Sequence, residues 1–148
     1  MAKTGTEEGR LASLTRRVAF AAEHRYYRED WSPEENSRVF GRAAKPGFHG
    51  HDYLCEVTVT GAVDETSGML VDLALLDEVL QTEVHDRFDG RRINIDVPEF
   101  TDGRLVPSCE NLAAFIFDKV QAALGEQIAV TRVIVRESDT LSAEVSRG

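Results

Sequence analysis

The sequence predicts a single α+β domain of four strands and two helices. Two segments with apolar residues at every second position come first, two segments with apolar residues at helical spacing follow, and a pair of short alternating segments ends the chain. The 148 residues suffice for one domain that buries roughly two thirds of its unfolded surface. The expected order is strand, strand, helix, helix, strand, strand.

Two strands are expected in the first half of the chain, over residues 17–24 and 51–63. In both, the side chains that share one face are mainly apolar, because alternate residues of a strand point the same way. These inward sets are Val18, Phe20, Ala22 and His24 in the first strand, and His51, Tyr53, Cys55, Val57 and Val59 in the second.

The segments around these strands read as irregular structure. Residues 1–13 are polar and aperiodic, which is typical of a flexible tail, so the folded domain is expected over 14–148. Residues 25–48 are rich in charge, Pro and Gly, and we expect a long functional loop there. Residues 64–68 form a turn.

The second half of the chain predicts two helices and a hairpin. Asp72 is placed to cap a helix over 73–84, and Ser108 to cap a second one that Gly125 stops. Residues 88–107, between the helices, read as a second loop region. The alternating segments 131–138 and 141–146 then predict a β-hairpin.

Charge and composition exclude several classes of protein. The net charge of −9 is opposite to what a nucleic-acid partner requires. Two arginine pairs, 16–17 and 91–92, would suit phosphates of a small anionic ligand or simply be solvated. No segment has the length of a membrane span or the pattern of a signal peptide. Cys55 and Cys109 form no disulfide framework, so a cytoplasmic protein is expected.

Three histidines are candidates for a metal site. His49 and His51 are two residues apart and share a strand face if the strand begins by residue 49, and His24 would reach them from a paired strand. Neutral imidazole is the commonest metal ligand, and three nitrogens leave a fourth zinc position open for catalysis. Alone, the pattern equally suits surface or core histidines. His85, near a helix end, suits a favourable interaction with the helix dipole.

Six segments together resemble the 6-pyruvoyltetrahydropterin synthase family, which includes the 6-carboxytetrahydropterin synthases of queuosine biosynthesis. In chain order they are "FAAEH", "FGRAAKPGFHGHDYLCEVTVTG", "GMLVDL", "NIDVPEF", "PSCENLA" and "VRESD". The resemblance spans about residues 16–146. It implies a T-fold, a four-stranded antiparallel sheet with two helices on one face, in which trimers close a barrel and pairs of trimers make a hexamer.

The resemblance also implies roles for particular residues. The family's zinc ligands match His24, His49 and His51, and the glutamate that anchors its pterin ring matches Glu137. A carboxylate suits that role because it can accept neighbouring N–H donors of the aminopyrimidinone edge together. The segment that lines the same pocket matches a run at the start of the second helix, namely Ser108, Cys109 and Glu110.

Two positions depart from the family pattern. The family uses a cysteine as general base, and Ala43, or Ala44 with a one-residue shift, stands in its place. The family's Asp-His pair aligns with Asp89 and Gly90, so the histidine is missing. Losing a positioned base typically removes a factor of about 10² to 10⁴ in rate.

His85 is a candidate for the missing acid/base group. It stands four residues before Asp89, so the two share a face if the helix continues that far. Cys55 lies on the buried strand face and suits a core role instead.

Three functions follow from these expectations. In the first, the chain is a zinc-dependent pterin enzyme whose acid/base group comes from His85, Asp89 or the segment 25–45. In the second, it cleaves or isomerises a dihydropterin side chain differently from the synthases. The enzyme class that the resemblance implies is a lyase of carbon-oxygen or carbon-carbon bonds. The third function is binding of a pterin or purine-like ligand without catalysis. The resemblance implies a homo-oligomer, a trimer or a hexamer.

Overall fold

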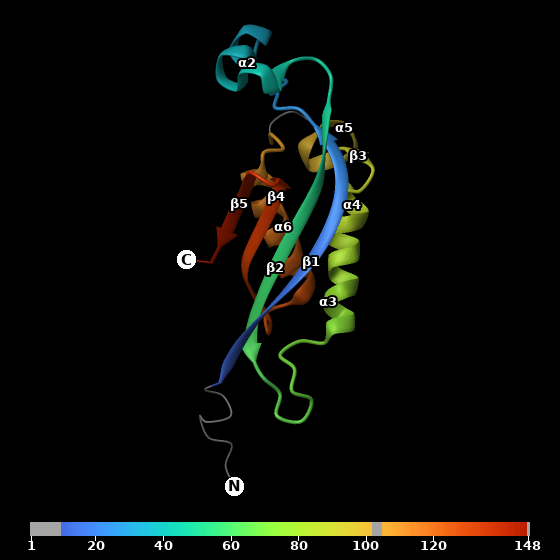
Figure 1. The fold of residues 1–148 in the computed structure, drawn as a ribbon, viewed down its shortest axis with the longest axis vertical. Helices are drawn as coiled ribbons and strands as arrows, with labels where there is room; N and C mark the ends of the chain where they lie inside the picture. Colours follow the sequence, from blue (N-terminus) through green and yellow to red (C-terminus); the bar gives the residue numbers. More distant parts are fainter. Residues whose placement is uncertain (1–9, 102–104, 148) are drawn as a thin grey trace.

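The computed structural model describes residues 10–101 and 105–147 and forms one sheet covered by helices (Figure 1). The strands are β1 (Leu11–His24), β2 (His49–Ala62), β3 (Arg91–Arg92), β4 (Ala129–Ser138) and β5 (Leu141–Ser146). The α-helices are α2 (Pro33–Phe40), α3 (Leu73–Leu80), α4 (Asp86–Phe88), α5 (Ile93–Asp96) and α6 (Cys109–Leu124). Two 3₁₀ turns, η1 (Gly41–Ala44) and η3 (Pro98–Phe100), and one π-helical turn, η2 (Gln81–His85), complete the set.

The predicted four-stranded antiparallel sheet is confirmed and has one small addition. The strand order is β3-β1-β2-β4-β5, and the neighbours from β1 to β5 are all antiparallel. The two residues of β3 pair in parallel with the end of β1. A two-residue strand has no alternation to read, which is why the sequence did not reveal it.

Long pairing between β1 and β2 forms the centre of the sheet. The two strands are in register from Leu11 opposite Ala62 to His24 opposite His49. Strand β1 begins at Leu11, three residues before the expected start of the domain, and residues 1–9 of the predicted tail lie outside the described residues. Most side chains of the two predicted inward faces are buried in the hydrophobic core, namely Phe20, Ala22, Tyr53, Cys55, Val57 and Val59.

The two main helices pack on one face of this sheet. Helix α6 lies against β4 and β5, and α3 contacts α6. The Asp72 carboxylate accepts a hydrogen bond from the Ala74 amide at the start of α3. Helix α3 continues through η2 and α4 to Phe88, beyond the predicted end at residue 84. The π-helical turn η2 joins the two α-helical segments.

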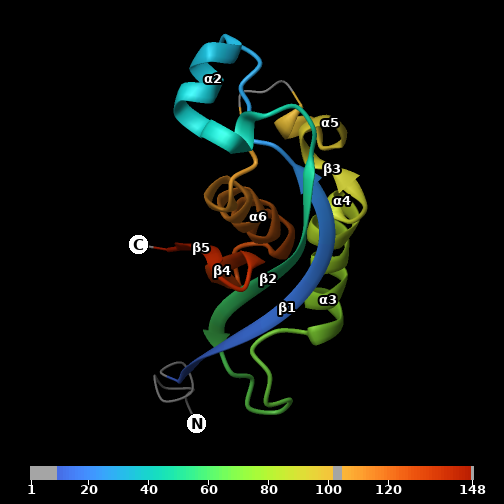
Figure 2. The same cartoon turned by 45° about the horizontal axis from the view of Figure 1, so that its top comes forward.

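The expectation of a loop over 25–48 is wrong, because this segment contains α2 and η1. The Ser32 hydroxyl accepts a hydrogen bond from the Glu35 amide, and Pro33 occupies the first turn. These are the residue types of a helix start, but the charged sequence of α2 hides it because no apolar stripe accompanies it. The buried Asn36 side chain ties α2 to Arg28. Helix α2 lies beyond the end of the sheet (Figure 2).

The second expected loop region also contains regular structure. Strand β3, helix α5 and turn η3 lie within residues 88–107, and residues 102–104 lie outside the described part. Ile93, Val97 and Phe100 from this region are buried in the core. None of the described helices is long and apolar enough to cross a membrane.

Adjacent leucines in α3 test the packing of the core. Leu76 is fully buried, whereas Leu75 is 42% exposed. We expect Leu76→Ala to lower the free energy of unfolding by about 2–5 kcal/mol, because it removes buried methyl groups and leaves a cavity. Leu75→Ala is the matched control and should change it by less than about 1 kcal/mol. Urea denaturation of the two variants measures the difference, and equal losses would contradict this packing.

Candidate metal centre

The pairing of β1 with β2 brings the three predicted histidines together. His24 is directly opposite His49, and His51 is opposite Ala22, so the three rings lie on the same side of the sheet. The ring centroids are 4.6 Å apart for His24 and His49, 5.0 Å for His24 and His51, and 5.1 Å for His49 and His51. One ring nitrogen from each lies within 4.8 Å of the others.

The tautomer of His24 is fixed by a carbonyl group. Its Nδ1 lies 2.8 Å from the Pro107 carbonyl oxygen, which can only accept, so Nδ1 carries the proton. The Tyr53 hydroxyl lies 3.2 Å from the same nitrogen. The lone pair is therefore on Nε2, which is buried. Partners of this kind orient histidines that bind metals.

Burial disfavours the protonated forms of His24 and His51 by lowering their pKa values. The pKa of His24 is lowered to about 4, mainly by burial and also by the neighbouring His49 and His51, against the opposing effect of the hydrogen bond to Pro107. Burial also lowers the pKa of His51, with Glu137 opposing. Neutral imidazoles are the form that binds a metal.

Two nitrogen atoms of the cluster are left without a partner. Among the described residues, Nε2 of His24 and Nε2 of His51 are buried and make no hydrogen bond. An unsatisfied buried polar atom costs about 1–3 kcal/mol, so such atoms call for an explanation. A divalent cation would satisfy both lone pairs. The residues present therefore fit a metal ion such as zinc.

Glu137 lies at the rim of the histidine cluster. Its carboxylate oxygens are 3.4 Å from Nε2 of His51 and 3.7 Å from Nε2 of His24, and its side chain is 11% exposed. The pairing of β4 with β5 shifts between Arg136 and Ser138, so Glu137 sits at a β-bulge. Bulges occur next to functional sites because they change the direction of a side chain.

The start of α6 supplies the remaining predicted pocket residues. The Cys109 thiol donates to Oε1 of Glu137 at 3.6 Å, and burial and Glu137 raise the pKa of Cys109 to about 12. The Ser108 hydroxyl accepts from the Asn111 amide at 3.1 Å and so caps the helix. Glu110 is exposed in the first turn. Cys109 is thus the residue of this run that contacts Glu137.

His85 and Asp89 form a pair separate from the histidine cluster. Nε2 of His85 is 3.6 Å from Oδ2 of Asp89, because the helix does continue to Phe88. Oδ1 of Asp89 accepts from the Ala21 amide at 2.9 Å, on the side of β1 opposite the pairing with β2. Two strand spacings, about 10 Å, therefore separate Asp89 from β2.

The residues at the positions that depart from the family pattern make backbone hydrogen bonds. The Ala43 carbonyl accepts from the Tyr26 amide at 2.9 Å, and Ala44 is buried. The Gly90 amide donates to the Ala21 carbonyl at 2.7 Å, and Gly90 has φ +74°, a conformation that favours glycine. Neither position offers a proton-transfer group.

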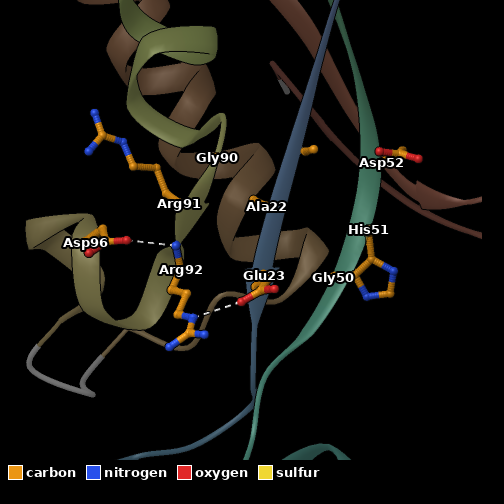
Figure 3. Close-up of a pocket in the computed structure, with 10 residues that line it drawn as sticks. Ala22, Glu23, Gly50, His51, Asp52, Gly90, Arg91, Arg92 and Asp96 are labelled. Carbon is orange, nitrogen blue, oxygen red and sulfur yellow. Dashed lines mark hydrogen bonds and ion pairs between the residues drawn. The ribbon is translucent and has the colours of Figure 1, made fainter.

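A cavity of about 600 Å³ opens at the same end of the sheet. It is lined by the ends of β1 and β2 and by β3, and His51 lines it together with Glu23, Asp52, Arg91 and Arg92 (Figure 3). Nε of Arg92 is paired with Glu23 at 2.9 Å (Figure 3). At the other predicted arginine pair, Arg16 is bound to Asp77.

Several residues of the site were not predicted from the sequence. Tyr53 could have been placed near the histidines from the sequence, because it shares a strand face with His51. No sequence pattern indicated Pro107, since its contact with His24 is made by a backbone carbonyl group. Tyr26, whose ring lies edge-on to His24 with centroids 5.3 Å apart, was placed in a loop.

Comparisons with known proteins agree with this architecture. The family model described as 6-pyruvoyl tetrahydropterin synthase matches residues 13–148. The 6-pyruvoyl tetrahydrobiopterin synthase of Homo sapiens is 37% identical over 128 residues, covering 86% of this chain and 86% of the relative. That of Dictyostelium discoideum is 35% identical over 130 residues, covering 88% and 93%.

A solved structure supports the same relation. The structure of Caenorhabditis elegans 6-pyruvoyl tetrahydropterin synthase superimposes with a TM-score of 0.86 at 29% identity, covering 94% of this chain and 97% of that one. The fold is therefore the T-fold of these proteins, as the sequence predicted. The chain belongs to the 6-pyruvoyl tetrahydropterin synthase family.

Proposed function

We propose that this protein is a zinc-dependent enzyme that acts on the side chain of a 7,8-dihydroneopterin-type substrate, with the triphosphate as the first candidate. The observation that carries the proposal is the cluster of His24, His49 and His51, in which the buried Nε2 atoms of His24 and His51 have no hydrogen-bond partner among the described residues. The names of the reported relatives favour tetrahydrobiopterin synthesis over queuosine synthesis. The reaction class is a lyase.

His24, His49 and His51 would hold the zinc ion. Three protein nitrogens are the donor set of catalytic zinc sites, which keep one position open. Zinc bound there would polarise an oxygen of the substrate side chain as a Lewis acid. The chain contributes the fixed tautomer of His24 through Pro107 and a buried setting that disfavours protonation of this imidazole.

Glu137 would anchor the pterin ring. Its carboxylate would accept two parallel N–H donors, which the aminopyrimidinone edge offers. The carboxylate is close to two of the histidine nitrogens, so a ring bound there places its substituents beside the cluster. The Cys109 thiol holds one carboxylate oxygen and limits its rotation. Ser108 and Glu110 complete this side of the proposed pocket.

His85 and Asp89 would supply the acid/base group that Ala43 and Gly90 cannot. The Gln81 amide nitrogen lies 3.1 Å from Nδ1 of His85 and donates to it, so Nδ1 accepts and Nε2 carries the proton toward Asp89. Because β1 separates this pair from the histidine cluster, we propose that it serves the site of a neighbouring chain in a homo-oligomer.

Mass spectrometry of reaction products tests the proposed activity. The zinc-loaded protein is incubated with 7,8-dihydroneopterin triphosphate and, separately, with 7,8-dihydroneopterin. We expect a product from at least one, and a rate about 10²- to 10⁴-fold lower for His85→Ala, because a positioned acid/base group is lost. No product from either compound would contradict the enzyme proposal.

Mixed oligomers test whether His85 acts across chains. His85→Ala and His51→Ala each remove one part of the proposed machinery, and co-assembled chains would contain some sites with both parts intact. We expect such mixtures to regain activity that neither variant has alone. The absence of recovery in mixtures shown to co-assemble would place His85 outside the neighbouring site.

Non-catalytic binding of a pterin is the second candidate. The observation that favours it is the loss of both proton-transfer groups at Ala43 and Gly90. It predicts tight binding of zinc and 7,8-dihydroneopterin without turnover. Ala43→Cys would then be the variant most suited to gain activity, since a thiol is returned to the family's position.

A further inference from the structure

Tyr26 lies beside the histidine cluster and has no role in the proposal above. Its ring stands at 84° to the ring of His24. Its side chain is half-buried, and among the described residues its hydroxyl makes no hydrogen bond. Tyr53, the phenol on the other side of His24, differs in being committed to Nδ1 of that histidine.

Tyr26 contacts the ring of His24, and Nε2 of His24 lies 3.7 Å from Glu137, the proposed pterin anchor. Burial raises the pKa of Tyr26, and the neighbouring Glu137, Cys109 and Glu110 raise it further. A tyrosine hydroxyl with an ordinary pKa of about 10 is already a neutral donor at neutral pH, and that of Tyr26 belongs to a ring in edge-on contact with His24. A neutral phenol can donate a hydrogen bond to a ligand oxygen.

Helix α2 and turn η1 hold the ring in this position. The Tyr26 ring contacts Phe40 edge-on with centroids 5.9 Å apart, and Phe40 stacks on Trp31 at 5.7 Å. The Tyr26 amide donates to the carbonyl of Ala43, the residue that replaces the family's cysteine. The backbone of Tyr26 is thus fixed to the segment where a proton-transfer side chain is missing.

We propose that the Tyr26 hydroxyl donates a hydrogen bond to an oxygen on the side chain of a pterin anchored at Glu137, and so selects ligands with a hydroxylated side chain. This inference rests on the proposed function. The geometry supports it because Tyr26 contacts His24, which lies 3.7 Å from Glu137, and the substituents of a pterin anchored there would lie beside His24.

Two ligands that differ only in the side chain test the role of Tyr26. Dissociation constants of 7,8-dihydroneopterin and of 7,8-dihydropterin, which lacks the side chain, are measured by calorimetry for zinc-loaded wild type and Tyr26→Phe. We expect Tyr26→Phe to weaken 7,8-dihydroneopterin by about 2- to 10-fold, the effect of one neutral hydrogen bond, and to leave 7,8-dihydropterin unchanged. Tyr27→Phe is the matched control and should leave both unchanged.

The outcomes separate this inference from the proposed function. If wild type binds both ligands and Tyr26→Phe binds them equally well, the role of Tyr26 is wrong and the pterin site stands. Equal weakening of both ligands also overturns it, because the hydroxyl would then act on the site as a whole. If wild type binds neither ligand, the proposed function fails and the inference fails with it.

Discussion

Replacing His51 with alanine is expected to weaken zinc binding by more than about 100-fold, since loss of even an outer partner of a ligand typically costs 10- to 100-fold. His51 contributes one of the three nitrogens that lie within 4.8 Å of one another. It is also only partly buried, so its loss disturbs the core less than loss of the fully buried His24. Competition with a chromophoric chelator measures the zinc affinity.

His85→Ala is the matched control for this experiment. His85 is a histidine of similar accessibility, but it is paired with Asp89 across β1 from the cluster. We expect its zinc affinity to equal that of wild type. Equal zinc affinity in all three proteins, or equal loss in both variants, would show that the ion is bound elsewhere.

Glu137→Gln is expected to weaken 7,8-dihydroneopterin binding by about 10- to 100-fold, because a hydrogen bond to a charged group contributes about 1.5–3 kcal/mol. The glutamine keeps the shape of the side chain and one acceptor oxygen, but it loses the charge that favours two donors together. Fluorescence titration of zinc-loaded protein measures the affinity.

Zinc content and a second variant make the Glu137 result specific. Glu137→Gln should retain zinc, because the proposed ligands are the three histidines. Glu144→Gln, at an exposed position of β5, is the matched control and should bind the pterin as wild type does. Unchanged pterin affinity in Glu137→Gln would contradict the anchor, and loss of zinc would show that the carboxylate belongs to the metal site.

The main elements of the fold were predictable because their signals are local. Alternation identified β1, β2 and the final hairpin, and the cap residues Asp72 and Ser108 located the starts of α3 and α6. Helix α2 was missed although Ser32, Pro33 and Glu35 have the pattern of a helix start. Capping residues mark where a helix can start, but apolar side chains at helical spacing are what predict the helix itself. A short charged helix at the edge of the domain has no such apolar stripe.

Only those features of the site that depend on the type of residue were predictable from the sequence. His24, His49 and His51 could be named from spacing and family resemblance, because ligand chemistry depends on the side chain. The bulge at Glu137 and the carbonyl of Pro107 depend on tertiary geometry that no local pattern encodes. The position of Tyr26 could not be predicted for the same reason, because it depends on the packing of its ring against Phe40 in α2.

A crystal structure of the purified protein, prepared without chelators and with zinc, tests the central claim most directly through anomalous scattering at the zinc edge. The account predicts one zinc peak per chain, with His24, His49 and His51 each contributing a nitrogen at about 2.0–2.1 Å and a fourth position free of protein ligands. Histidine rings that point away from one another, or a peak only at other residues, would contradict it.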